Sequence, residues 1–392
     1  MDEKSLKPQL RFKGFADAWE QRKLGDIAQI TMGQSPDGTT YSDKPSKYIL
    51  VQGNADLENG WVKPRIWTTQ MTKKADAGDL IMSVRAPAGA MGKTAYNVVL
   101  GRGVAGIKGN NFLYQILTKM DADGFWKKLS CGSTFESLNS DHIKNAEINI
   151  SPASNEQQKI GMFFSNLDNL ITLHQRKLDK LSNVKKALLE KMFPKNDSDV
   201  PEIRFKGFTD AWEQRKLNEC AEIIGGGTPS TSISEYWNGN IDWYAPAEME
   251  GKRYADGSVK KITDLGLKNS SAKMLPANKT ILFTSRAGIG KMAILVKPAC
   301  TNQGFQSLVL KDDIAPYFIY SMESRIKNKA ERIAAGSTFL EISGKLLGCI
   351  SLHMPKNTEQ QKIGTFFSNL DNLITLHQRK QNNKKLWRHL IC

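Results

Sequence analysis

The chain has 392 residues, of which 55 are Lys or Arg and 40 are Asp or Glu, which gives a formal net charge of +15. This length predicts about two to three domains, and the hydrophobic content of 40% excludes a disordered chain. The basic excess favours a polyanionic partner such as nucleic acid, although many basic proteins bind none.

The N-terminal segment 1–8 is charged and lacks the apolar run of a signal peptide. No apolar run elsewhere in the sequence approaches the ~18 residues needed to span a bilayer. The five cysteines are scattered and form no C-x-x-C pair, which excludes a zinc site of the usual spacing and a dense disulfide framework. We therefore expect a protein of a reducing compartment, the cytoplasm.

The next segment, Leu10–Leu24, reads LRFKGFADAWEQRKL and recurs with two differences at Ile203–Leu217. A second block, Glu156–Lys177, recurs with one change at Glu359–Lys380. Position 11 corresponds to position 204 and position 156 to position 359, so the enclosed interior is ten residues longer in the second copy. Near-identical flanks around divergent interiors indicate a tandem duplication, in which a fixed frame carries two heads that bind different things.

The two interiors, residues 25–150 and 218–353, are rich in Gly, Ser, Thr, Trp and Tyr. Short β-prone runs alternate with glycine-rich turns, which predicts a compact, mainly β domain in each half. Phe112–Lys119 and Pro316–Ala330 are candidate helices inside these domains.

A long helix is predicted after each interior. Pro152 precedes the first helix, and Ser154 is a candidate N-cap with Gln157 completing a capping box. Apolar residues then follow at steps of three and four until Phe193-Pro194 ends the stripe. A helix of about 40 residues would be about 60 Å long and needs a partner along its length.

We predict that this partner is the second copy, so that the two helices pack as an antiparallel coiled-coil spacer. The alternative is two amphipathic helices that each pack on their own domain. The second helix departs from the first after Lys380, where Gln381 stands at the position of Leu178, and it is shortened. The predicted interface residues are Phe163, Leu167, Leu170, Leu178, Phe366, Leu370 and Leu373.

The predicted fold class is α+β, with two mainly β domains, two long helices and an internal pseudo-two-fold repeat. The predicted boundaries are 1–152 for the first β domain, 153–194 for the central helix, 195–355 for the second β domain and 356–392 for the C-terminal helix.

Weak echoes connect the two interiors. Ser83-Val84-Arg85 followed by Gly92-Lys93 resembles Ser285-Arg286 followed by Gly290-Lys291, and Gly-Ser-Thr-Phe occurs at 132–135 and at 336–339. An Arg-Gly-Lys turn can hold a phosphate or reach a guanine edge, and a Gly-Ser-Thr turn can donate to a phosphate. The alternative for each is a tight turn whose hydroxyls cap a helix. The candidate nucleic-acid-binding residues are Ser83, Arg85, Lys93, Arg102, Ser133, Thr134, Ser285, Arg286, Lys291, Gln303, Ser337 and Thr338.

Motifs of catalysis are missing from the sequence. A chain that modifies adenine itself should carry an acidic-Pro-Pro-aromatic motif, and none is present. Gly101, Gly103 and Gly106 spell G-x-G-x-x-G without opening a helix, and Ala287–Lys291 lacks the upstream Gly and the following Ser or Thr of a phosphate-binding loop. We therefore expect no catalytic residue and no metal site. Two functions are alternatives to a non-catalytic nucleic-acid-binding protein. One is a self-contained DNA methyltransferase or nuclease, and the other is a free-standing transcriptional regulator.

The blocks EQQKIGMFFSNLDNLITLHQRKLDKL and RFKGFADAWEQRKLGDI resemble the repeated conserved regions of type I restriction-modification specificity subunits. The resemblance covers nearly the whole chain, in the order recognition domain, long helix, recognition domain, helix. It implies that each variable domain is a target-recognition domain that reads one half of an asymmetric, bipartite double-stranded DNA target, while the helices set the gap.

The resemblance also implies partner proteins. The conserved regions would bind two methyltransferase subunits, and two translocase-nuclease (restriction) subunits would join them for DNA cleavage. S-adenosylmethionine, ATP and Mg²⁺ would belong to these partners, so that no cofactor and no catalytic centre are expected in this chain.

Overall fold

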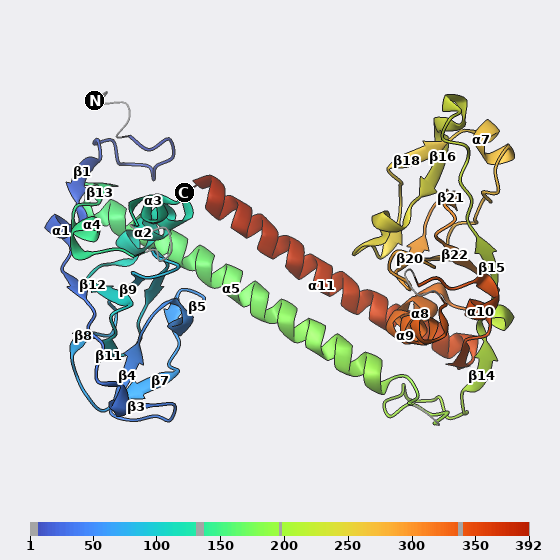
Figure 1. The fold of residues 1–392 in the computed structure, drawn as a ribbon, viewed down its shortest axis with the longest axis horizontal. Coiled ribbons are helices and arrows are strands. Elements are labelled where there is room, and N and C mark those ends of the chain that lie inside the picture. Colours follow the sequence, from blue (N-terminus) through green and yellow to red (C-terminus); the bar gives the residue numbers. More distant parts are fainter. Residues whose placement is uncertain (1–6, 131–136, 196–197, 336–339, 392) are drawn as a thin grey trace. The chain divides into compact units, whose positions relative to one another are not determined.

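The computed structural model of the chain describes residues 7–130, 137–195, 198–335 and 340–391, with side chains as far as Leu386. The chain divides into two compact units, Met1–Arg176 with Gln378–Cys392 (unit 1) and Lys177–His377 (unit 2). Each unit contains one β-rich head and a part of each long helix, α5 (Ser154–Lys191) and α11 (Asn357–Ile391) (Figure 1). We call residues 7–150 head 1 and residues 198–354 head 2.

Head 1 is built from two mixed sheets. The six-stranded sheet has the order β2 (Ile30–Met32), β12 (Val104–Ile107), β9 (Leu80–Ser83), β10 (Met91–Lys93), β6 (Trp61–Val62) and β5 (Leu57–Glu58). The five-stranded sheet has the order β3 (Tyr41–Ser42), β7 (Ile66–Thr68), β4 (Tyr48–Val51), β11 (Val98–Leu100) and β8 (Lys73–Ala75). Its helices are α1 (Leu24–Ile27), α2 (Asn111–Ala122), α3 (Phe125–Leu129) and α4 (Ser140–Lys144), with 3-10 turns η2 (Gly38–Thr40) and η3 (Asn54–Asp56). Every residue of β9, β11 and β12 is buried, so these strands lie in the middle of the head.

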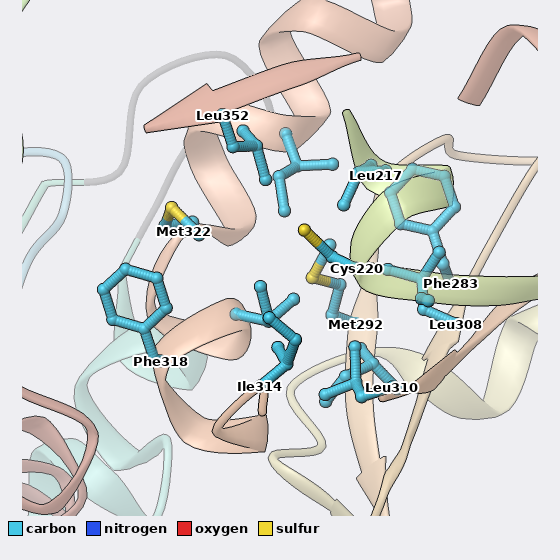
Figure 2. Close-up of a cluster of buried hydrophobic side chains, with 14 of the residues drawn as sticks. Leu217, Cys220, Phe283, Met292, Leu308, Leu310, Ile314, Phe318, Met322 and Leu352 are labelled. Atoms are coloured by element: carbon cyan, nitrogen blue, oxygen red, sulfur yellow. The ribbon is translucent and has the colours of Figure 1, made fainter. Parts of the chain in front are cut away.

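Head 2 repeats this plan with a longer interior. One sheet has the order β15 (Ala221–Gly225), β22 (Gln306–Leu310), β19 (Thr280–Phe283), β20 (Met292–Leu295) and β17 (Tyr254–Ala255), and another has β18 (Lys260–Ile262), β16 (Trp237–Tyr244) and β21 (Ala299–Thr301). Its helices are α6 (Leu217–Cys220), α7 (Asp264–Lys268), α8 (Pro316–Ser321), α9 (Glu323–Ile333) and α10 (Gly344–Gly348), with η4 (Ser234–Tyr236) and η5 (Pro246–Met249). Figure 2 shows side chains from its strands and helices, including Cys220, Phe283 and Phe318, gathered in one buried cluster.

The two candidate helices of the interiors are both present. Phe112–Lys119 lies within α2, which confirms the first prediction. Pro316–Ala330 is helical but divided, because α8 ends at Ser321 and α9 begins at Glu323, with Met322 between them. The backbone N–H of Met322 bonds to the carbonyl oxygen of Ile319 at 3.0 Å, which tightens the last turn of α8.

The first repeated block forms the strand that closes each head. Its Glu-Gln-Arg-Lys segment is β1 (Glu20–Lys23) in head 1 and β14 (Glu213–Lys216) in head 2. β1 pairs antiparallel with β13 (Glu147–Ile150), and β14 pairs antiparallel with β23 (Ser351–Met354). β13 and β23 are the last strands before the long helices, so the duplicated frame joins the beginning of each head to its end.

A buried ion pair holds this frame to the helix. In unit 1 the guanidinium of Arg11 donates to both carboxylate oxygens of Glu156, at 2.8 and 2.7 Å. In unit 2 Arg204 donates in the same way to Glu359, at 2.7 Å to each oxygen. Both glutamates lie in the first turn of a long helix and are at most 1% exposed. A bidentate, charge-assisted contact of this kind fixes the orientation of the two side chains as well as the distance between them. A carboxylate is also favourable at a helix N-terminus.

The predicted capping box is not formed. α5 begins at Ser154 itself, and the Gln157 amide donates to the carbonyl oxygen of Ser151 at 2.7 Å. Gln360 of α11 donates likewise to the carbonyl oxygen of Pro355 at 2.9 Å. In both helices the glutamine therefore binds the chain that enters the helix rather than an N–H group of the first turn.

The two long helices contact each other inside both units. In unit 1 Lys384 Nζ lies 3.0 Å from His174 Nε2, and in unit 2 Lys185 forms an ion pair with Asp371 at 2.6 Å. A later residue of α5 thus meets an earlier residue of α11, so the helices pair in antiparallel fashion, as predicted.

The seam between the helices is more polar than the apolar stripe indicates. Gln381, which stands at the position of Leu178, is 4% exposed and hydrogen-bonds to Gln175. Phe163, Leu170 and Leu373, by contrast, are 42%, 43% and 47% exposed.

The seven predicted interface residues therefore do not all lie between the two helices. Phe163 and Phe366 pack edge-on against Phe12 and Phe205 of their own heads, with ring centroids 6.1 and 5.7 Å apart. Leu370 belongs to the core of unit 2, where Leu181 of α5 also packs, while Leu167 and Leu178 are half-buried. The alternative of packing on the own domain thus holds for the aromatic positions, because each helix begins on its head before it meets the other helix.

Removal of one arginine should show how much the buried ion pair contributes to the stability of the fold. Arg204→Met leaves the Glu359 carboxylate buried without its cation, so we expect the free energy of unfolding to fall by about 3 kcal/mol. Arg204→Met combined with Glu359→Leu should recover part of that loss. Urea unfolding followed by circular dichroism measures both. Unchanged stability of the single variant would contradict a structural role for the pair.

The pair also predicts a pH dependence. The pKa of Glu156 lies below its usual value of 4.5, chiefly because Arg11 donates hydrogen bonds to the carboxylate. A folded-state pKa below the unfolded one stabilises the fold above about pH 4.5, and this stabilisation is lost as the pH falls through the folded pKa. The stability difference between the wild-type chain and Arg11→Met should therefore narrow between about pH 7 and about pH 3. A constant difference would show that Glu156 is not the titrating group.

Candidate nucleic-acid interface

Each head presents one turn that carries an arginine, at equivalent positions of the fold. In head 1 the N–H of Val84 bonds to the carbonyl of Gly103 at 2.9 Å, and the N–H of Leu138 bonds to the carbonyl of Val84 at 2.9 Å. In head 2 Ser285 makes the same two bonds, with Gly304 at 2.8 Å and Ile342 at 3.0 Å. Val84 therefore corresponds to Ser285, and the next residues, Arg85 and Arg286, correspond to each other.

A glycine closes each turn. The N–H of Gly89 bonds to the carbonyl of Ser83 at 2.8 Å, and the N–H of Gly290 bonds to that of Thr284 at 2.9 Å. Both glycines have positive φ, +105° and +87°, which a residue with a Cβ rarely adopts. A Cβ at Gly89 would also lie 2.7 Å from the Cβ of Trp126. The turn is therefore pressed against its neighbouring helix, which fixes where the arginine projects. We call residues 84–89 the Arg85 turn and residues 285–290 the Arg286 turn.

The two guanidinium groups are available to a ligand. Arg85 is exposed, whereas Arg286 is half-buried and lies beside Gly304. Among the described residues, neither guanidinium has a hydrogen bond or ion pair within the chain. An arginine held on a rigid turn with its five donors free can bind a phosphate or the O6 and N7 of a guanine.

A neighbouring loop adds a position at which the heads differ. Gly103 and Gly304 correspond, so the exposed residues before them, Arg102 and Gln303, also correspond. The backbone N–H of Arg102 bonds to Ser35 Oγ at 3.1 Å, and Gln303 accepts a hydrogen bond from the Thr228 hydroxyl. Both loops are thus held in place while their side chains remain exposed.

Two predicted serines lie inside the protein. Ser83 and Ser285 are 0% exposed, and the Ser83 hydroxyl donates to the carbonyl oxygen of Arg85 at 3.0 Å. A buried hydroxyl at the base of a turn stabilises that turn and cannot reach a ligand on the surface. For Ser83 the alternative of a tight turn therefore fits better. The Ser285 hydroxyl is buried as well, but it has no hydrogen-bond partner among the described residues.

The two predicted lysines are also engaged within the protein. Lys93 Nζ lies 4.7 Å from the ring centroids of both Trp61 and Tyr114, and burial lowers its pKa. Lys291 forms an ion pair with Glu250. The sequence likeness of Gly92-Lys93 to Gly290-Lys291 is therefore misleading.

The strand register gives the correct equivalence. Met91 pairs with Met82 on β9, and Met292 pairs with Phe283 on β19, so Met91 corresponds to Met292. The counterpart of Lys291 is then Ala90, the residue before Met91, and Lys93 is the last residue of β10. Arg85 and Gly89 have the same spacing as Arg286 and Gly290, so Gly92-Lys93, which lies farther along the chain, is not the counterpart of Gly290-Lys291.

Ser133, Thr134, Ser337 and Thr338 lie outside the described residues. The segments next to them do adjoin the arginine turns, because Arg85 forms a β-bridge with Ser137.

The identical parts of the long helices expose a second kind of surface. Leu170 and Leu173 of α5 are 43% and 55% exposed, and their counterparts Leu373 and Leu376 of α11 are 47% and 45% exposed. The apolar periodicity predicts Leu170 and Leu373 in the seam and does not include Leu173 and Leu376. Only the repetition of the block in two helices could have indicated that these leucines form a surface for a partner. Exposed apolar side chains grouped in this way are typical of protein contacts.

Neither a metal site nor a membrane-spanning helix is found in the part of the chain that the structure describes. Within the described ranges, no group of three or more His, Cys, Asp or Glu is placed to hold a metal ion. In the same part of the chain, no helix has the length and apolarity to cross a membrane.

Comparison with known proteins matches this architecture. The model of the type I restriction modification DNA specificity domain matches residues 16–183 and again 209–384. The MjaIX specificity subunit of Methanocaldococcus jannaschii is 37% identical over 175 residues, 44% of this chain and 40% of that protein. The EcoR124I/EcoR124II specificity subunit of Escherichia coli is 30% identical over 167 residues, 41% of each chain. This chain thus spans about two fifths of the length of these curated relatives.

A solved structure extends the likeness to the whole fold. The S subunit of a type I restriction-modification system from M. genitalium superposes with a TM-score of 0.68 over 98% of this chain and 97% of that one. The two are 15% identical, so this likeness concerns the fold. The two family matches cover most of the sequence, one over each head with its helix, and the chain therefore belongs to the type I restriction-modification DNA specificity family.

Proposed function

We propose that this chain is the DNA specificity subunit of a type I restriction-modification complex, and that it reads a bipartite, asymmetric double-stranded target. The observation that carries the proposal is the pair of equivalent arginine turns, Arg85 and Arg286, set in two heads whose frames are nearly identical and whose interiors differ. A common frame gives both heads the same approach to DNA, and different interiors give them different readings.

The chemistry of the exposed loops supports two different half-sites. Arg102 can form bidentate hydrogen bonds with guanine O6 and N7, whereas Gln303 in the corresponding loop can form them with adenine N6 and N7. The net charge of +15 supplies sequence-independent attraction to phosphates. Ser133, Thr134, Ser337 and Thr338 stay proposed contacts, because described residues close to them in the sequence, Ser137 and Ile342, adjoin the arginine turns.

The long helices are proposed to act as spacer and scaffold. Leu170 with Leu173 and Leu373 with Leu376 offer the same apolar surface twice, so two copies of one partner can bind at equivalent positions. We assign these surfaces to two methyltransferase subunits, with two restriction subunits joining the complex in the cytoplasm. S-adenosylmethionine, ATP and Mg²⁺ would be bound by those partners, and this chain itself would be non-catalytic.

Substitution of one arginine should damage one half of the target. Arg286→Ala is expected to weaken recognition by head 2 by roughly 1–3 kcal/mol, which corresponds to about fivefold to 150-fold, and to leave the half-site of head 1 intact. Arg85→Ala should do the reverse. Mapping of adenine methylation in cells that express the chain with its methyltransferase partner measures both half-sites at once.

Lys291→Ala is the matched control for the Arg286 turn, because that lysine is already paired with Glu250. It should leave the preference of both half-sites unchanged. Equal loss at both half-sites in either arginine variant would contradict the assignment of one half-site to each head.

Charge on the helix surface should remove the methyltransferase partner one copy at a time. A carboxylate at Leu173→Asp or Leu376→Asp would be desolvated on binding, so each variant should retain one copy and the double variant none. Native mass spectrometry of the purified complex counts the copies. Asn166→Asp, an exposed polar position on the same helix, is the control. Two copies bound to the double variant would exclude this surface.

A further inference from the structure

A small cavity of about 210 Å³ lies in unit 2, lined by residues of α9, of β23 and of the segment directly after α5. Met322 and Leu352, both labelled in Figure 2, belong to its apolar lining. The volume falls below the roughly 300–1,000 Å³ of pockets that take a whole small molecule, so the cavity suits a single small group. Its polar lining consists of Arg325, Asn328, Lys329, Arg332 and His353. We call it the α9 cavity.

The charge of this lining is of one sign. Its charged residues are basic, and no Asp or Glu lines the cavity. Among the described residues, Arg325, Lys329 and Arg332 form no ion pair. The carboxylates of Glu190 and Asp199 attract Arg325 and His353 from outside the cavity. The positive charge is therefore only partly compensated within the chain.

Two of the cations are held in place by backbone carbonyl groups. The guanidinium of Arg325 donates to the carbonyl oxygens of Pro194 and Leu189, at 2.9 and 3.2 Å. Lys329 Nζ donates to the carbonyl oxygen of Ser351 at 2.6 Å. These bonds fix the positions of the two cations, but a carbonyl oxygen carries only a partial charge and neutralises neither of them. Among the described residues Arg332 has no hydrogen bond, so its donors remain for a ligand.

The pKa values show the mutual repulsion of these groups. Burial, and then the nearby charge of Arg325, lower the pKa of Lys329. Burial lowers the pKa of His353 below its usual value of 6.5, and the charges of Lys329 and Arg325 lower it further. An anion in the cavity would relieve this repulsion, because an opposite charge nearby favours the charged form of each group.

Other basic clusters of the chain contain their own anion. In head 1 Lys74 and Lys108 both pair with Asp76, at 3.0 Å each. In head 2 Arg215 pairs with Asp313 at 2.8 Å. The α9 cavity differs from these clusters because it combines several cations with a hollow and has no carboxylate in its lining. This combination indicates a site for an external anion rather than a solvated basic surface.

We propose that the α9 cavity binds a phosphate group through Arg332, Lys329 and His353. Guanidinium and ammonium groups donate charge-assisted hydrogen bonds to phosphate oxygens, and a neutral imidazole can donate a further one. Arg325 contributes its charge while its donors hold the chain after α5. The phosphate group belongs either to a free phosphate ion or to the backbone of bound DNA.

The position of α9 makes the DNA backbone a suitable carrier. An ideal Cβ on Gly290, which closes the Arg286 turn, would lie 2.6 Å from the Cβ of Lys327 on α9. The helix that carries the cations thus also supports the turn proposed to read bases. Only this carrier rests on the proposed function, whereas the phosphate site itself does not.

Proton NMR of the histidine rings tests the site in the full chain. The probe is inorganic phosphate, with sodium chloride of equal ionic strength as the reference, and His353→Gln assigns the resonance of His353 among the five histidines. A bound phosphate places negative charge beside the imidazole, so the pKa of His353 should rise by about 1. No rise up to about 10 mM phosphate, a concentration that detects even weak binding, would overturn the proposal.

Two variants locate the contact. Arg332→Met removes an exposed cation of the lining and should abolish most of the rise in the pKa of His353. Lys268→Met removes the same charge from an exposed position of α7 outside the cavity and should leave the rise unchanged. Circular dichroism verifies that both variants are folded. An equal rise in both variants would show a general effect of charge and would contradict the site.

The salt dependence of duplex binding identifies the carrier. If a backbone phosphate occupies the cavity, Arg332→Met should lower the slope of log K against log salt by about 1 for every sequence. An unchanged slope, together with the NMR response, assigns the site to free phosphate. Failure of the wild-type chain and its methyltransferase partner to prefer any target would contradict the proposed function and would leave the phosphate site standing.

Discussion

Each half of the molecule depends on one constraint, a bidentate salt bridge. It joins an arginine of the first repeated block to a glutamate of the second. Arg11 with Glu156, and Arg204 with Glu359, lock the segment before the closing strand to the first turn of a long helix. Because both charges are withdrawn from water, the pair tolerates little change in geometry. Everything between the two blocks can diverge, provided that it returns the chain to the same closing strand.

This division explains how two heads with different interiors keep a common presentation. The turns of Arg85 and Arg286 are fixed by the same backbone bonds and the same closing glycine, although the residues around them differ. The neighbouring loop is fixed as well, while its exposed residue is Arg102 in one head and Gln303 in the other. A recognition surface can change its side chains only if its backbone stays in place, and the frame provides that condition.

The apolar face of each long helix has two different packing surfaces, its own head and the other helix. Near its start each helix packs aromatic residues such as Phe163 or Phe366 on its own head, and further along it contacts the other helix through polar pairs such as His174 with Lys384. A single apolar stripe therefore contacts first its own head and then the other helix, and some of its leucines remain on the surface. At the end of α5, Phe193 completes the aromatic core of unit 2.

The sequence by itself determined the duplication, the two long helices, the mainly β heads and the correspondence of Arg85 with Arg286. These features are properties of repetition and periodicity, which can be read without knowing any contact. Tertiary structure alone decided that Ser83 is buried, that Lys93 lies between two rings, that Leu170 is exposed and that Phe193 fills a core. The physical reason is that burial depends on partners far away in the chain. Phe193 reaches Trp212 and Phe318, and no local pattern specifies such a meeting.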